Sequence, residues 1–189
     1  TETDVSSTST LADAQQKFDN LSRNIISFEH AQVLWNLTTE KNLAERLNVL
    51  GNYIDNMSDV GKTKLFRFIE DEMSISGAYR TSSTGSRNRV VQVLEGVDRG
   101  LEEISPNVLD AFARYTCDEW KRAVARNKNT AAETLDFLAD SDGTWLLINV
   151  AKHPRTASQT IAKIFAKTKY EDVLDAISYN QNTSQKILT

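Results

Sequence analysis

A short pattern recurs three times in the second half of the chain, and it restricts the possible folds more than any other feature. Its copies occupy positions 124–127 (Val-Ala-Arg-Asn), 150–153 (Val-Ala-Lys-His) and 177–180 (Ile-Ser-Tyr-Asn), so the spacing between them is nearly constant. A threonine is the third residue after each copy: Thr130, Thr156 and Thr183. A fixed period of this length is typical of solenoids, in which each unit buries its apolar face against neighbouring units.

The segments between these turns have the apolar spacing of short helices. Leucine or isoleucine recurs with the same period, at Leu109, Leu135, Ile161 and Ile187. We expect each threonine, like the pair Ser105-Pro106, to cap the N-terminus of the next helix, because a hydroxyl can accept an unpaired backbone N–H there. The Asn or His at the end of each copy is expected to close the preceding helix, and Asn tolerates the left-handed conformation common at such ends.

The rest of the chain divides into two parts. Residues 1–9 are rich in Ser and Thr, which predicts a disordered tail. Residues 10–104 predict several amphipathic helices without an internal period, interrupted by a polar loop at 82–86. Residues 105–189 carry the period. With only 7 glycines and 2 prolines, the composition also favours helices. The sequence therefore predicts an all-α protein: an irregular N-terminal helical region, then a short α-solenoid.

The periodic part, roughly residues 105–189, resembles the leucine-rich repeat variant family. The resemblance rests on the stretches VARNKNTAAETLDFLAD, VAKHPRTASQTIAKIFA and ISYNQNTSQKIL, although Lys128 stands where the family has proline. It implies a right-handed superhelix of alternating α and 3₁₀ helices. The family's iron–sulfur variant has a cysteine cluster that this chain lacks, and no catalytic residue can be carried over.

Composition narrows the location and the class of partner. The formal charge is −4, which disfavours a protein that coats nucleic acid. The sequence has one cysteine, no membrane-spanning apolar run and no secretory signal, so we expect a cytoplasmic protein that does not enter a membrane. The chain stops where Ile187 and Leu188 begin a helix, and we expect self-association through this open last repeat.

The motifs that resemble catalytic or cofactor sites have structural interpretations. Gly61, Lys62 and Thr63 match the end of a phosphate-binding loop, but the glycine that should come five residues earlier is Asn56. The two histidines, His30 and His153, are too far apart in sequence for a short metal-binding motif. Cys117 is followed by two acids rather than by the basic residues that accompany a reactive cysteine, so we expect a buried or half-buried structural cysteine. We therefore expect no enzymatic activity, metal or cofactor.

Two binding functions remain open. We favour a non-catalytic protein–protein interaction module, because solenoids usually present an extended binding surface. The alternative is a nucleic-acid-binding repeat protein that uses basic residues of the polar loop and of the turns. Those candidate macromolecule-binding residues are Arg80, Arg87, Arg89, Lys121, Arg122, Arg126, Lys128, Lys152 and Arg155. Trp120 and Trp145, which lie nearly one period apart, are expected to stack between units in the core.

Overall fold

The computed structural model describes residues 26–39, 41–75, 89–96 and 103–188, together with residues 12, 13 and 16. The expected tail at 1–9 and the polar loop at 82–86 lie outside these residues. All the named elements are helices, and the β-structure described is a single isolated bridge between Ile26 and Met57. The helices are α2 (Phe28–Leu37), α3 (Leu43–Ile54), α4 (Asp59–Ile75), α5 (Arg89–Glu95), α6 (Pro106–Tyr115), α7 (Asp118–Val124), α8 (Ala132–Leu138), α9 (Thr144–Lys152), α10 (Ser158–Lys167), α11 (Glu171–Ser178) and α12 (Gln185–Leu188). The prediction of an all-α chain is confirmed for this part of the protein.

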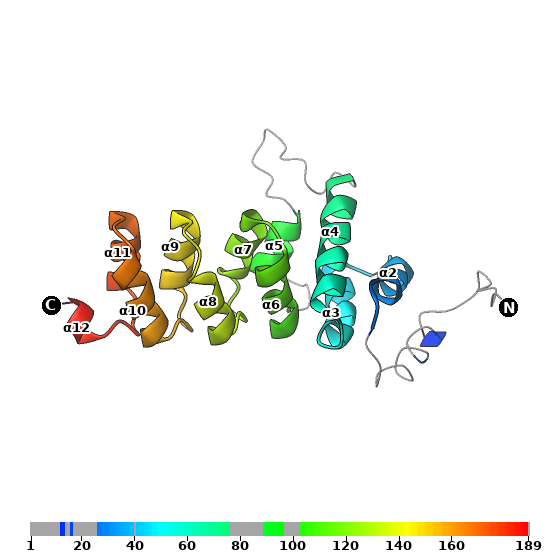
Figure 1. Cartoon of the computed structure of the whole chain (residues 1–189), viewed down its shortest axis with the longest axis horizontal. Coiled ribbons are helices and arrows are strands. Elements are labelled where there is room, and N and C mark those ends of the chain that lie inside the picture. Colours follow the sequence, from blue (N-terminus) through cyan, green and yellow to red (C-terminus); the bar gives the residue numbers. More distant parts are fainter. Residues whose placement is uncertain are drawn as a thin grey trace.

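The molecule is elongated, and its helices follow one another along the long axis (Figure 1). From α5 onward they alternate between two layers. One layer contains α5, α7, α9 and α11, and the other contains α6, α8, α10 and α12. Contacts between successive helices of the first layer are extensive, most of all between α9 and α11. This arrangement brings residues one period apart to neighbouring positions along the layer.

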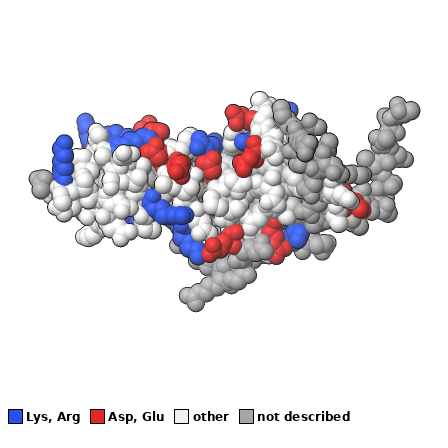
Figure 2. Space-filling model, turned by 90° about the horizontal axis from the view of Figure 1, so that it is seen from below, with Lys and Arg blue, Asp and Glu red and all other residues white. Residues whose placement is uncertain are grey.

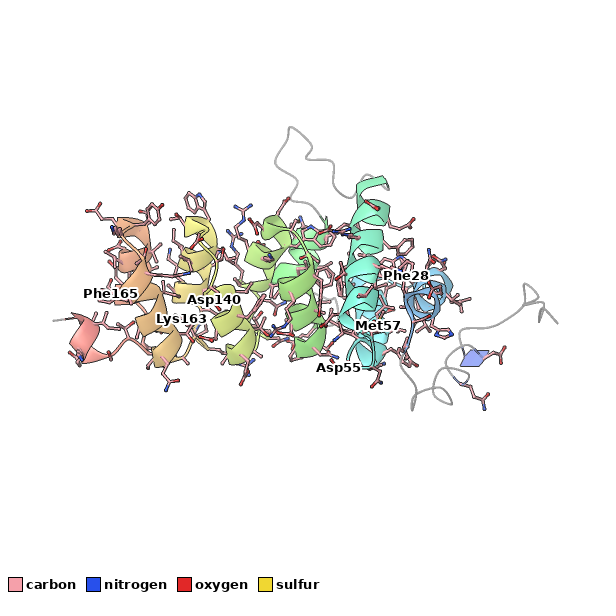
Figure 3. The ribbon with its side chains drawn as sticks, viewed as in Figure 1. Phe28, Asp55, Met57, Asp140, Lys163 and Phe165 are labelled. Carbon is pink, nitrogen blue, oxygen red and sulfur yellow. The ribbon has the colours of Figure 1, made fainter. Side chains whose placement is uncertain are left out.

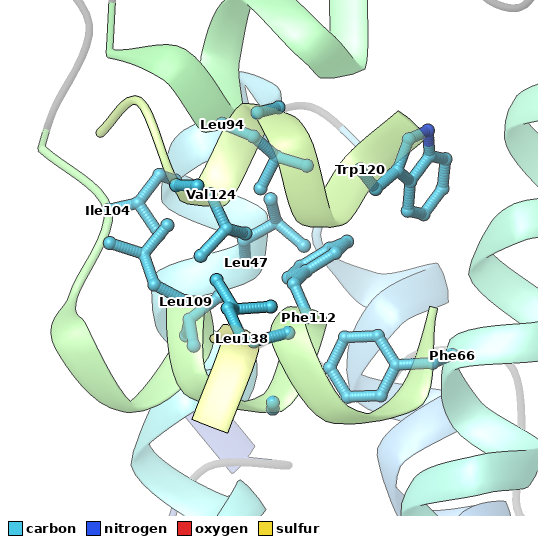
Figure 4. Close-up of a cluster of buried hydrophobic side chains, with 14 of the residues drawn as sticks. Leu47, Phe66, Leu94, Ile104, Leu109, Phe112, Trp120, Val124 and Leu138 are labelled. Atoms are coloured by element: carbon cyan, nitrogen blue, oxygen red, sulfur yellow. The ribbon is translucent and has the colours of Figure 1, made fainter. Parts of the chain in front are cut away.

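The buried side chains form one continuous core from Ile26 to Ile177. Figure 4 shows its central part, where Leu47 from α3, Phe66 from α4 and Leu94 from α5 meet side chains of α6, α7 and α8. The ring centroids of Phe66 and Phe112 are 4.8 Å apart, and those of Phe112 and Trp120 are 5.5 Å apart. The helices on the two sides of residue 104 therefore share a single apolar interior.

Side-chain caps set the starts of several helices before residue 104. The backbone N–H of His30 donates to the Ser27 hydroxyl before α2, and that of Glu45 donates to the Asn42 side chain before α3. At α4 the backbone N–H of Gly61 donates to the Ser58 hydroxyl over 3.2 Å. Ser105 occupies the N-cap of α6 with Pro106 in its first turn, but the Ser105 hydroxyl does not cap this helix.

The repeated threonines do not cap the helix that follows them, so that prediction is wrong. The N-cap residues of α8 and α10 are Ala131 and Ala157, one position beyond Thr130 and Thr156, and neither makes a side-chain cap. Each threonine hydroxyl instead donates back to a carbonyl six residues earlier. Thr130 donates to Val124 over 2.6 Å, and Thr156 and Thr183 make the equivalent bonds over 2.5 Å. Because the turn is tight, the hydroxyl lies beneath the helix that has just ended, where C-terminal carbonyls need donors.

The left-handed helix ends expected at the Asn and His positions are also absent. No non-glycine residue in the described part of the chain has a positive φ, and His153 has a φ of −71°. These residues close the turns with their side chains instead. Asn127 Oδ1 accepts the backbone N–H of Asn129 over 2.9 Å, and Asn180 Oδ1 accepts that of Asn182 over 2.8 Å. An Asx turn of this kind needs no left-handed residue.

The prediction that Trp120 and Trp145 stack between units in the core is wrong. Trp120 is fully buried, whereas Trp145 is 67% exposed. Asn127 and His153 occupy equivalent turns after α7 and α9, and the same register makes Leu146, which is buried, the equivalent of Trp120. A shift of one residue turns a side chain by about 100° around a helix, which moves Trp145 to the surface.

Candidate interaction surface

Adjacent turns are joined by a ladder of buried hydrogen bonds. The Asn127 side-chain amide donates to the Leu94 carbonyl over 2.7 Å, and His153 Nε2 lies 2.9 Å from the Asn127 carbonyl. The Asn180 amide donates to the carbonyls of Ala151 and His153 over 2.6 and 3.0 Å. Asn127, His153 and Asn180 are all buried. We call these three residues the turn ladder; it fixes the C-terminal ends of α5, α7, α9 and α11 at one side of the molecule.

His153 replaces asparagine in this ladder by dividing the two roles between its ring nitrogens. Its Nδ1 accepts the backbone N–H of Arg155 over 3.1 Å. The proton of the neutral ring is therefore assigned to Nε2, which donates to the Asn127 carbonyl. Burial lowers the pKa of His153, and the nearby Arg155 guanidinium lowers it further, whereas the bond to Asn127 acts in the opposite direction. Protonating Nδ1 would place its N–H opposite the backbone N–H of Arg155, and two donors cannot hydrogen-bond to each other.

Acidification should therefore destabilise the fold through His153. The unfolded chain binds a proton near the ordinary histidine pKa of 6.5, but the folded chain resists it. Stability is full above that pH and falls as the pH drops through the lowered pKa, by at most about 1.4 kcal/mol per pH unit. Urea denaturation between pH 7.5 and 5 should show this loss in the wild type and in His30→Asn, but not in His153→Asn. An unchanged pH dependence in His153→Asn would contradict the assignment.

The second layer has its own repeated bridges. Thr134 donates to an Asp110 carboxylate oxygen over 2.8 Å, and Thr160 donates to Asp136 over the same distance. Lys163 reaches back from α10 to Asp136 at 3.3 Å and to Asp140 at 3.0 Å; Figure 3 labels Lys163 and Asp140. These acids hold neighbouring helices together, so they are explained by packing.

Three of the predicted basic residues cannot be placed as side chains. Arg80 and Arg87 lie outside the described residues. Arg89 is the first residue of α5, and its side chain is likewise outside the description. The loop part of the predicted nucleic-acid surface therefore stays a sequence-based prediction.

Two other predicted basic residues are paired with acids that sequence reasoning did not connect to them. Arg126 forms an ion pair with Glu95 at 2.7 Å, and the Glu95 side chain is only 2% exposed. The Lys128 ammonium group forms an ion pair with Glu103 on the surface. No sequence signal links Glu95 or Glu103 to these residues, because both acids precede the periodic region. On the face seen in Figure 2, basic and acidic side chains are interspersed.

The remaining basic candidates differ in their exposure to solvent and in their polar partners. Lys121 lies half-buried on α7, 3.7 Å from Asp118, and Arg122 is half-buried beside it. Arg155 is exposed and donates to the Asn129 carbonyl over 3.3 Å. Lys152, at the end of α9, is exposed and has no ion pair or side-chain hydrogen bond with the described residues. Only Lys152 and Arg155 combine exposure with freedom from acidic partners within the described residues.

Sequence reasoning missed a set of large side chains that are left exposed. Tyr179 is 82% exposed, Trp145 67%, Tyr170 57% and Phe165 42%. All four lie on α9, α10 and α11 or directly beside them. The register of the repeat could have identified two of them. It places Trp145 at the position of Glu119 in α7, and it places Tyr179 at the position of Arg126, just after α7.

The other chemically notable residues have structural roles. Cys117 is half-buried at the N-cap of α7, as expected, and its backbone N–H donates to Glu70 over 3.0 Å. Gly61 and Lys62 lie in the first turn of α4. In the described ranges, no three His, Cys, Asp or Glu side chains gather as a metal site would require. Within the same ranges no helix has the length and apolarity to cross a membrane.

Comparisons with protein-family models, with curated proteins and with solved structures gave no match. Function is therefore inferred from the residues of this chain alone.

Proposed function

We propose that the chain is a non-catalytic protein–protein interaction module built on a short right-handed solenoid of helical repeats. The observation that carries the proposal is the group of exposed aromatic side chains on the α9–α11 part of the molecule, from Trp145 to Tyr179. Large aromatic side chains are enriched at the energetic centres of protein interfaces. The turn ladder supports a rigid framework, which lowers the entropy lost when such a surface binds.

The proposal that the chain has no enzymatic activity rests on what its reactive side chains do. Both ring nitrogens of His153 are engaged in the turn ladder. The Tyr115 hydroxyl donates to Asp59 over 2.5 Å, and burial, with that contact, raises its pKa to about 12. Neither residue is arranged as a general base beside a nucleophile.

Nucleic-acid binding is the second candidate, and the free Lys152 and Arg155 favour it. Arg126 and Lys128 do not, because their charges are balanced by Glu95 and Glu103. Reversing the charge of Arg126 would also damage the fold. The test therefore uses the double variant Lys152→Glu/Arg155→Glu. The control is Lys169→Glu, because Lys169 is exposed and lies just before α11, at the opposite end of the helices of the first layer.

The protein should capture a protein partner that survives moderate salt and nuclease treatment. Phosphate contacts release counterions and weaken steeply with salt, whereas apolar packing does not. Affinity capture at about 50 and 200 mM salt, with and without nuclease, measures the difference. The Lys152→Glu/Arg155→Glu double variant should retain the protein partner as well as Lys169→Glu does. Recovery of nuclease-sensitive material alone, lost in the double variant, would contradict the proposal and favour the second candidate.

A further inference from the structure

Two of the exposed aromatic side chains lie at the same end of neighbouring helices. Trp145 is the second residue of α9, and Tyr170 is the N-cap of α11. The Lys167 ammonium donates to the Ser141 carbonyl over 2.6 Å, which joins the segments that lead into these two helices. Since the turn ladder joins the other ends, α9 and α11 run side by side in the same direction, as Figure 1 shows.

Trp145 is not needed for packing within the chain. The other tryptophans, Trp35 and Trp120, are fully buried, whereas Trp145 exposes two-thirds of its surface. The equivalent residues are Glu119 on α7 and Asp172 on α11, so the repeat does not require an aromatic side chain there. An indole that is two-thirds exposed and lies outside the apolar core is best explained by contact with another molecule.

Among the described side chains at this end of α7, α9 and α11, the charges are mainly negative. Five carboxylates lie in the first turns of α7, α9 and α11 or just before them: Asp118, Glu119, Asp142, Glu171 and Asp172. Three lysines belong to the same end. Lys121 lies 3.7 Å from Asp118, and Lys167 donates to the Ser141 carbonyl. Of the three, Lys169 has no ion pair or side-chain hydrogen bond with the described residues. Among the described residues of these three helices, acids therefore outnumber lysines at the end where the aromatic pair lies.

We propose that the surface formed by Trp145, Tyr170, Asp142, Glu171 and Asp172 binds an arginine-containing basic segment of a partner protein. A guanidinium group can stack on an indole face by a cation–π interaction, and it pairs with carboxylates through its planar donors. Exposed aromatic rings with neighbouring acids supply both contacts. This inference rests on the proposed function, because it names the chemistry of the partner that the interaction module recognises. We call these five residues the Trp145 surface.

The test uses a fluorescein-labelled nonapeptide of alternating arginine and alanine, titrated with the full chain and followed by anisotropy. Binding should weaken about tenfold in Trp145→Ala, because a central aromatic residue dominates such interfaces. It should weaken less in Asp172→Asn, and it should stay unchanged in Val60→Ala, which removes an equally exposed apolar side chain from α4. The matching peptide with glutamate in place of arginine should not bind. The residues changed are all exposed, so circular dichroism should show every variant folded.

A second readout locates the bound peptide. Because Trp35 and Trp120 are buried, acrylamide quenches mainly Trp145 in the wild type, and the arginine peptide should protect it. No binding of the arginine peptide, or equal binding by Trp145→Ala and the wild type, would overturn the inference. The proposed function fails separately, if affinity capture recovers only nuclease-sensitive material. If a protein partner is captured equally by Trp145→Ala, the proposed function stands and the Trp145 surface does not.

Discussion

Replacing Asn127 by alanine should lower the free energy of unfolding by about 2–4 kcal/mol. Asn127 is 2% exposed, and its amide donates to the Leu94 carbonyl while its Oδ1 accepts the Asn129 N–H. Alanine would leave both backbone groups without these partners, and each unsatisfied buried group costs about 1–3 kcal/mol. Urea denaturation followed by far-ultraviolet circular dichroism measures the change.

Asn129→Ala is the matched control for this prediction. The Asn129 amide donates to a Glu103 carboxylate that faces solvent, so its loss should cost less than about 1 kcal/mol. Asn180→Ala should resemble Asn127→Ala, since its amide serves two buried carbonyls. Equal, small losses at Asn127 and Asn129 would show that the turn ladder does not stabilise the stack.

The period and its anchor residues could be predicted from the sequence, because the turns recur at a nearly constant spacing. The residues that anchor the period, Asn127, His153, Thr130 and Thr156, are buried. The direction of their hydrogen bonds could not be predicted. A threonine hydroxyl both donates and accepts, so the same residue can cap the following helix or satisfy the preceding one. Only the tightness of the turn decides, and it places the hydroxyl below the earlier helix.

The ion pairs and the exposed aromatic residues show where periodicity stops being informative. Glu95 lies far before Arg126, in a helix that carries none of the repeated anchors, so no pattern in the sequence joins them. Trp145 lies one residue away from the core register, and an error of one position separates a buried ring from an exposed one. The candidate surface therefore emerges only when the register is fixed in three dimensions.

The second large effect concerns the ion pair that anchors α5 to the turn after α7. Arg126→Ala should lower the free energy of unfolding by about 2–3 kcal/mol, because it removes the guanidinium partner of a desolvated carboxylate. The Glu95 side chain is 2% exposed, and its Oε1 lies 2.7 Å from Arg126 NH1. Arg126 itself is 47% exposed, so the expected cost is smaller than for a pair that is buried on both sides.

Lys152→Ala provides the control, since Lys152 occupies the equivalent position on α9, is exposed and has no ion-pair partner among the described residues. Its loss should change stability by less than about 0.5 kcal/mol. The double variant Glu95→Gln/Arg126→Ala should recover part of the loss, because a neutral amide costs less to bury than a carboxylate. If Arg126→Ala and Lys152→Ala were equally mild in urea denaturation at pH 7, the pair would be incidental. Arg126 would then return to the set of basic residues available for a binding partner.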